Sequence, residues 1–121
     1  MRFLLLTLLV VLLPLAAVVA YDVSSPIGTF QSIHPEVDRN DIVLTVSDAS
    51  GGVLNSLDMA IDGVQQVNCS GDYTINPDTR NVDSLAITCG TYAGTVEFLR
   101  IDDQYLVTLN REVTMGIVGK N

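Results

Sequence analysis

The chain has 121 residues, with 14 acidic and 6 basic side chains and a formal net charge of −8. A chain of this length forms one small domain. Phosphate backbones and anionic membrane surfaces would repel its negative charge, so we expect no nucleic-acid partner.

The first 20 residues have the three-part pattern of a secretory signal peptide. A basic start at Arg2 is followed by an apolar run over 3–19 and by small side chains up to Ala20. We expect this helical segment to be cut after Ala20, which would leave a more acidic mature domain over 21–121. The competing interpretation is an uncut membrane anchor, although 17 helical residues span only about 25 Å, the short edge for a bilayer core. The pattern therefore predicts a secreted, extracellular protein without membrane attachment after cleavage.

The mature chain has the period of β-strands rather than that of helices. Residues 21–28 are rich in small and polar side chains and include Pro26, so we expect them to form an extended lead-in. Beyond them apolar side chains recur at every second position, most clearly at Leu57, Met59 and Ile61. Turn-forming residues separate such stretches. We expect strands over 29–33, 41–47, 56–61, 64–69, 72–75, 84–89, 95–101, 104–110 and 112–118.

These short, closely spaced strands predict an all-β antiparallel meander that forms either a compact sandwich or a small barrel. The alternation breaks between 95 and 101, because Phe98 and Leu99 are both apolar. A bulge or burial on both faces would explain that break. An immunoglobulin-like sandwich is disfavoured, since the chain has no tryptophan.

Gly28-Thr29-Phe30, at the start of the meander, resembles the opening of calycin-type ligand-binding barrels. Those barrels carry a tryptophan at the position that Phe30 occupies here. The resemblance covers three residues and implies, at most, a barrel with a ligand-binding interior. The chain is not assigned to that family on this basis.

Cys69 and Cys89 are the two cysteines of the chain, and in an oxidising compartment they form a single disulfide. Closing a loop of about 20 residues stabilises a domain by about 3 kcal/mol in the chain-entropy model. If the two cysteines face each other on antiparallel strands, their register fixes a hairpin. It pairs Gly71 with Ile87, Tyr73 with Leu85 and Ile75 with Asp83, with the turn over 76–82.

Asn68-Cys69-Ser70 matches the N-x-[ST] sequon for N-linked glycosylation. By strand alternation Asn68 points away from the face that Cys69 occupies, which leaves room for a glycan. A single sequon also arises by chance, and its middle residue here is expected in a disulfide. Asn68 is therefore a candidate glycosylation site, and the sequence leaves its occupancy open.

Residues suited to catalysis or to metal binding are few. His34, the one histidine, lies in a stretch typical of an exposed loop, and no G-x-S-x-G motif surrounds a serine. No C-x-x-C pair and no calcium-loop motif occurs, so we expect no metal and no cofactor. Acidic residues such as Asp58 and Asp62 fit a solvated strand face. Tyr92, between Gly90 and Gly94, is the candidate contact residue, in a loop that we expect to be exposed.

Two hypotheses from different classes follow. The first is a secreted, non-catalytic β-domain that binds an extracellular protein, glycan or small ligand. The second is a small secreted hydrolase that uses a carboxylate pair, one member of which has a raised pKa. A third, weaker hypothesis is a protease inhibitor that presents residues 89–94 as a loop tethered by the disulfide. The absence of a catalytic motif favours the first.

Overall fold

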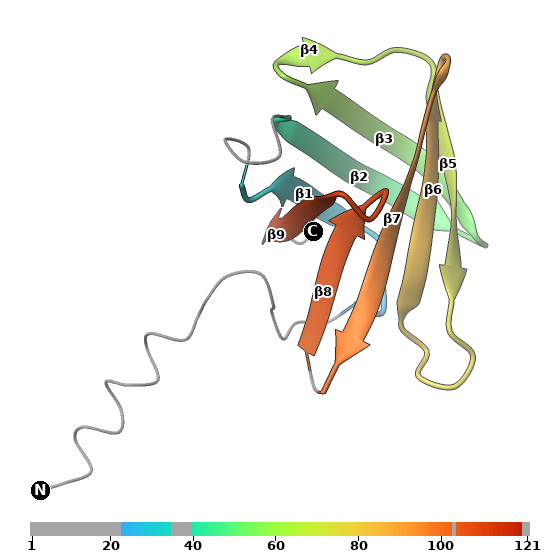
Figure 1. The fold of residues 1–121 in the computed structure, drawn as a ribbon. Coiled ribbons are helices and arrows are strands. Elements are labelled where there is room, and N and C mark those ends of the chain that lie inside the picture. Colours follow the sequence, from blue (N-terminus) through green and yellow to red (C-terminus); the bar gives the residue numbers. More distant parts are fainter. Residues whose placement is uncertain (1–22, 35–39, 103, 120–121) are drawn as a thin grey trace, which may run out of the picture.

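The computed structural model describes residues 23–34, 40–102 and 104–119, so the signal-peptide prediction for 1–20 lies outside the described residues. The described chain is all-β (Figure 1). Its strands are β1 (Gly28–Ser32), β2 (Ile42–Ser50), β3 (Val53–Ile61), β4 (Val64–Gln65), β5 (Cys69–Ile75), β6 (Val82–Cys89), β7 (Tyr92–Ile101), β8 (Gln104–Leu109) and β9 (Val113–Gly119).

The sheet closes into an antiparallel barrel, which decides between the two architectures that the sequence allowed. Its strands follow the order β2-β1-β9-β8-β7-β6-β5-β3, and pairing of β2 with β3 completes the ring. The short strand β4 lies outside the ring and pairs with the end of β3. The meander connectivity predicted from the short turns is therefore confirmed.

Strand alternation fills the barrel interior with apolar side chains. On β2, for example, Ile42, Leu44 and Val46 are buried while the residues between them are only partly covered. Phe30 and Phe98 meet edge to face in this interior, with ring centroids 5.9 Å apart. The interior is thus a packed core. Its most deeply buried side chains are Phe30, Leu44, Val46, Met59, Val82, Leu85, Ile87, Val96, Val107, Leu109 and Met115.

The lead-in that precedes β1 takes part in this core. Val23 is only 2% exposed and belongs to the buried cluster, and Pro26 is buried as well. The carbonyl of Val23 accepts a hydrogen bond of 2.8 Å from the backbone N–H of Val82, at the start of β6. The segment expected to be a simple extension therefore packs against the barrel and is fixed to β6.

The β5–β6 hairpin confirms most of the predicted register. Cys69 pairs with Cys89 as predicted. The predicted pairs of Gly71 with Ile87 and of Tyr73 with Leu85 are also present. The prediction that Ile75 pairs with Asp83 is wrong, because Ile75 pairs with Val82 instead. The register shifts between Thr74 and Ile75, so β6 carries one extra residue at this point. That irregularity is a β-bulge, which a pattern of period two does not predict.

Two other strand predictions need correction. The strand expected over 64–69 covers only Val64–Gln65, because Asn68 has a left-handed φ of 57° that interrupts an extended chain. The break at Phe98 and Leu99 is neither a bulge nor burial on both faces. The β7–β8 register is regular there, with Phe98 buried and Leu99 58% exposed.

Within the ring, β3 and β5 are joined by fewer residue pairs than any other two neighbouring strands. Only the pairs of Val53 with Asp72 and of Leu54 with Gly71 join these strands. Gly71 makes this approach possible, since a Cβ there would lie 2.7 Å from the Ala86 carbonyl oxygen and 2.8 Å from the Leu54 side chain. The pairing of β3 with β5, which we call the β3–β5 seam, thus depends on a position without a side chain.

Candidate functional site

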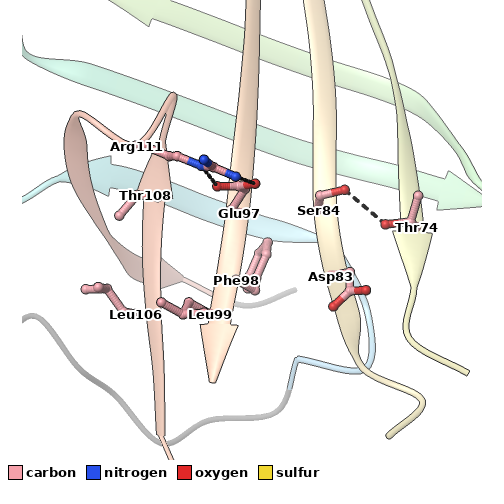
Figure 2. Close-up of a pocket in the computed structure, with 9 residues that line it drawn as sticks. All are labelled: Thr74, Asp83, Ser84, Glu97, Phe98, Leu99, Leu106, Thr108 and Arg111. Carbon is pink, nitrogen blue, oxygen red and sulfur yellow. Dashed lines mark hydrogen bonds and ion pairs between the residues drawn. The ribbon is translucent and has the colours of Figure 1, made fainter. Parts of the chain in front are cut away.

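A groove on the outer face of the barrel is the candidate functional site, and we call it the outer groove (Figure 2). It has a volume of about 570 Å³ and crosses the strands β5, β6, β7 and β8. Neighbouring strands lie about 4.8 Å apart, so it extends about 14 Å across the sheet. Its lining residues are Thr74, Asp83, Ser84, Glu97, Phe98, Leu99, Leu106, Thr108 and Arg111.

A row of polar side chains runs across the outer groove. The register places Thr74 beside Ser84, Ser84 beside Glu97, and Glu97 beside Thr108. The hydroxyls of Thr74 and Ser84 are 2.9 Å apart and share a hydrogen bond, which is drawn in Figure 2. Because side chains opposite each other on neighbouring strands lie close together, the row forms a continuous polar strip.

The bulge in β6 adds a carboxylate to this strip. Asp83 is the residue that the register shift leaves without a partner on β5, between buried Val82 and Ser84. Its side chain is exposed and lines the outer groove together with Ser84, although consecutive strand residues normally face opposite sides. The bulge thereby turns the Asp83 carboxylate toward the groove.

Two leucines form the apolar part of the outer groove. Leu99 and Leu106 are partners on β7 and β8, and Figure 2 shows both side chains at the same end of the groove. Leu99 is 58% exposed and Leu106 is half-buried. Exposed apolar side chains grouped beside polar ones are a common feature of surfaces that bind a partner.

An ion pair borders the groove opposite the leucines. The Arg111 guanidinium donates from Nε to Glu97 Oε1 at 2.8 Å and from Nη2 to Glu97 Oε2 at 3.3 Å, a bidentate arrangement. The hydrogen bond from Arg111 lowers the pKa of the Glu97 carboxyl below its ordinary value. Glu97 is therefore held ionised.

The β8–β9 turn holds Arg111 in this place. Asn110 and Arg111 have left-handed φ angles of 55° and 60°, as in the type I′ turns of hairpins. The turn closes through the Glu112 N–H and the Leu109 carbonyl, 3.0 Å apart. The Asn110 side chain also accepts a hydrogen bond of 2.9 Å from the Thr95 N–H. The turn is thus folded back over β7, within reach of Glu97.

The residues singled out in the sequence are not gathered at this groove. Cys69 and Cys89 form the predicted disulfide, with their Cα atoms 4.0 Å apart, at the end of the β5–β6 hairpin. Asn68 directly precedes it and is exposed. His34 is exposed ahead of 35–39, which lie outside the described residues.

Tyr92 does not lie in the exposed loop that the sequence predicted. It is the first residue of β7 and is half-buried, because the hairpin turn consists of only Gly90 and Thr91. Its hydroxyl lies over Gly94, where a Cβ would be 2.6 Å from it. Burial raises the pKa of Tyr92, while a hydrogen bond with Asn110 opposes this shift. Whether Tyr92 contacts a partner stays a prediction.

Tyr92 also lines a smaller cavity of about 140 Å³, and the other residues that line it include Ile42, Leu109 and Glu112. The segment 89–94, considered as an inhibitor loop, is a tight hairpin between β6 and β7 in which Cys89 pairs with Tyr92.

The carboxylates considered for catalysis or calcium binding are dispersed. Asp58 is exposed on the outer face of β3, and Asp62 accepts a hydrogen bond of 2.8 Å from the Asp41 N–H at the β3–β4 turn. Within 23–34, 40–102 and 104–119, no three acidic, histidine or cysteine side chains are grouped as a metal site would require.

The sequence did not indicate the outer groove. Leu99 breaks the alternation of the strand. An apolar residue at this outward-facing position was the signal in the sequence that could have indicated the groove. In the part of the chain that the structure describes, no helix has the length and apolar character needed to cross a membrane. Comparison of the chain with protein-family models, with curated proteins and with solved structures finds no match.

Proposed function

We propose that this protein is a secreted, non-catalytic binding protein and that the outer groove holds an extended, positively charged segment of an extracellular partner protein. The leader-like pattern of 1–20 supports export, and the Cys69–Cys89 disulfide is consistent with an extracellular location. The observation that carries the proposal is the combination of exposed leucines and an uncompensated carboxylate in one groove.

The charges of the groove indicate the chemistry of the partner. Arg111 neutralises Glu97 in the bidentate pair, so Asp83 leaves the groove with a net negative charge. The whole chain is negative as well, which attracts a basic partner. A segment with a lysine or arginine opposite Asp83 and an apolar side chain on Leu99 would satisfy both parts of the groove. Its volume lies within the usual range for binding pockets.

Selection from a library of random peptides on the purified, oxidised protein tests the proposal. We expect enriched peptides to combine basic and apolar residues. Leu99→Asn should weaken their binding about tenfold or more, because burying a leucine contributes about 1.5–3 kcal/mol. Val64→Asn is the matched control, since Val64 is 62% exposed but lies on β4, outside the groove.

The charged part of the groove has its own pair of variants. Asp83→Asn should remove the preference for basic residues, whereas Asp58→Asn, on the exposed face of β3, should retain it. Equal binding by wild type, Leu99→Asn and Asp83→Asn would show that the peptides bind elsewhere and would contradict the groove assignment.

A carboxylate-pair hydrolase is the alternative that the groove must be tested against, because Asp83 and Glu97 both line it. A general acid in such an enzyme needs a raised pKa, whereas Arg111 lowers the pKa of Glu97. Assays on chromogenic glycosides separate the two functions. Hydrolysis that disappears in Glu97→Gln and in Asp83→Asn would favour the enzyme over the binding protein.

A further inference from the structure

We propose that Asn68 carries an N-linked glycan and that the glycan is transferred before the Cys69–Cys89 disulfide closes. This inference rests on the secretion included in the proposed function, but it concerns a different surface from the outer groove. Asn68-Cys69-Ser70 is the single N-x-[ST] sequence of the chain with a residue other than proline in the middle.

The folded protein has room for a glycan at this position. Asn68 lies in the connection between β4 and β5, which arches over one end of the barrel in Figure 1. Asn68 is exposed, and the preceding Val67 is 68% exposed. Thr74, at the outer groove, is six positions from Asn68 along β5, a distance of about 20 Å. The attachment point of the glycan is therefore at a different part of the barrel surface from the groove.

The same folded structure holds the sequon too firmly for a transferase to bind it. The Asn68 carbonyl accepts a hydrogen bond of 3.4 Å from the Gly90 N–H. Cys69 is bonded to Cys89, and Ser70 is paired with Thr88 in the β5–β6 ladder. All three sequon residues are thus tied to β6 or to the turn that follows it. An enzyme must seat the acceptor as a free segment, so transfer has to precede formation of this hairpin.

The order of synthesis leaves a time in which the sequon is present but the hairpin cannot yet form. Asn68 is synthesised 21 residues before Cys89, which corresponds to about 1–4 s at ordinary rates of synthesis. During that time Cys69 has no cysteine partner within the chain. The step itself forms a bond between Asn68 Nδ2 and C1 of a lipid diphosphate-linked oligosaccharide, and the C1–O bond breaks. The lipid diphosphate leaves, and the amide proton is transferred to base.

Cell-free translation of the full chain with endoplasmic-reticulum microsomes tests this proposal. Protection from added protease reports translocation, and a mass shift reversed by peptide N-glycosidase reports the glycan. We expect a shift of one glycan on part of the wild-type chains and none on Asn68→Gln. Asn55→Gln removes an exposed asparagine outside any sequon and should behave as wild type.

The role of disulfide closure is tested by Cys89→Ser, which leaves the sequon intact but removes the partner of Cys69. We expect a larger modified fraction in this variant and in wild type translated with dithiothreitol. The readout does not require a folded product. Equal fractions in wild type and Cys89→Ser would overturn the competition between the two modifications.

Translocation and glycosylation can fail separately. Chains that are protected from protease but unmodified would overturn the glycan and leave secretion standing. Unprotected chains would overturn the secretion of the proposed function. In that case residues 1–20 are exchanged for the leader of a well-characterised secreted protein, and absence of the glycan on that chain would overturn the present proposal.

Discussion

Arg111 and Glu97 join the β8–β9 turn to the middle of β7 through two hydrogen bonds, of which the shorter is 2.8 Å. Both side chains are accessible to solvent, with exposed fractions of 81% and 37%. Exposed ion pairs contribute little to stability. The pair matters chiefly because it fixes the position of a guanidinium at the edge of the outer groove.

Removal of the guanidinium should change the titration of Glu97. In Arg111→Gln the pKa of the Glu97 carboxyl should rise toward its ordinary value, because the hydrogen bond that lowers it is lost. Carboxyl chemical shifts followed by NMR over an acid titration measure this change. Arg80→Gln serves as the control, and an unchanged Glu97 titration in Arg111→Gln would contradict the assigned cause.

The same pair predicts a direction for stability against pH. The pKa of Glu97 is lower in the folded state, so its contribution is present above the ordinary glutamate pKa and is lost as pH falls through the folded value. Denaturation of wild type and Glu97→Gln should therefore differ slightly near neutral pH, because the pair is exposed, and should converge in acid. Urea titrations at a series of pH values provide the measurement.

Loss of the disulfide should destabilise the barrel by about 3 kcal/mol, the entropic value for a loop of about 20 residues. The variant that tests this replaces both Cys69 and Cys89 by serine, so that no free thiol remains. The midpoint of urea denaturation should decrease, since only non-covalent contacts then join β5 to β6. A midpoint equal to that of the wild type would show that the hairpin needs no covalent closure.

Gly71→Ala should weaken the β3–β5 seam. The new Cβ would lie 2.7 Å from the Ala86 carbonyl oxygen, and backbone cannot yield as a flexible side chain can. Overpacking of this kind costs about 1–3 kcal/mol. Thermal denaturation measures the loss, and Asp72→Ala, at the exposed neighbouring position, should have little effect.

The lead-in should contribute measurably to folding. Val23→Ala removes two methyl groups from a side chain that is 2% exposed, and we expect a loss of about 1–3 kcal/mol. Val67→Ala makes the same chemical change at a position that is 68% exposed. Similar unfolding free energies for the two variants would mean that the lead-in does not act as part of the core.

Much of the fold followed from the sequence because two signals were strong. Alternation of apolar residues identified the inner face of most strands, since burial on one face imposes a period of two. The cysteines then fixed the register of β5 and β6, because a disulfide between neighbouring strands permits few pairings. Neither signal carries information on whether a sheet closes. The choice between sandwich and barrel depended on contacts between β2 and β3 and between β1 and β9.

The outer groove could not be predicted from the sequence, for related reasons. Asp83 faces the groove because of a bulge, and no residue pattern marked that irregularity. The leucines become neighbours only in the β7–β8 register, so Leu99 alone looked like a break in the alternation. Tyr92 was expected in a loop because of its flanking glycines, but Gly94 instead leaves space for the Tyr92 ring within the strand.

Closure of the ring also determines when the protein can finish folding. Thr29 of β1 pairs with Gly119 of β9, so the first strand waits for the last one to be synthesised. Contacts between residues so distant in the sequence form slowly. Until then β1 and the neighbouring β2 can associate only with each other and with β3. Until β9 is present, the edge of β1 that faces away from β2 therefore stays unpaired and open to strand pairing with another chain.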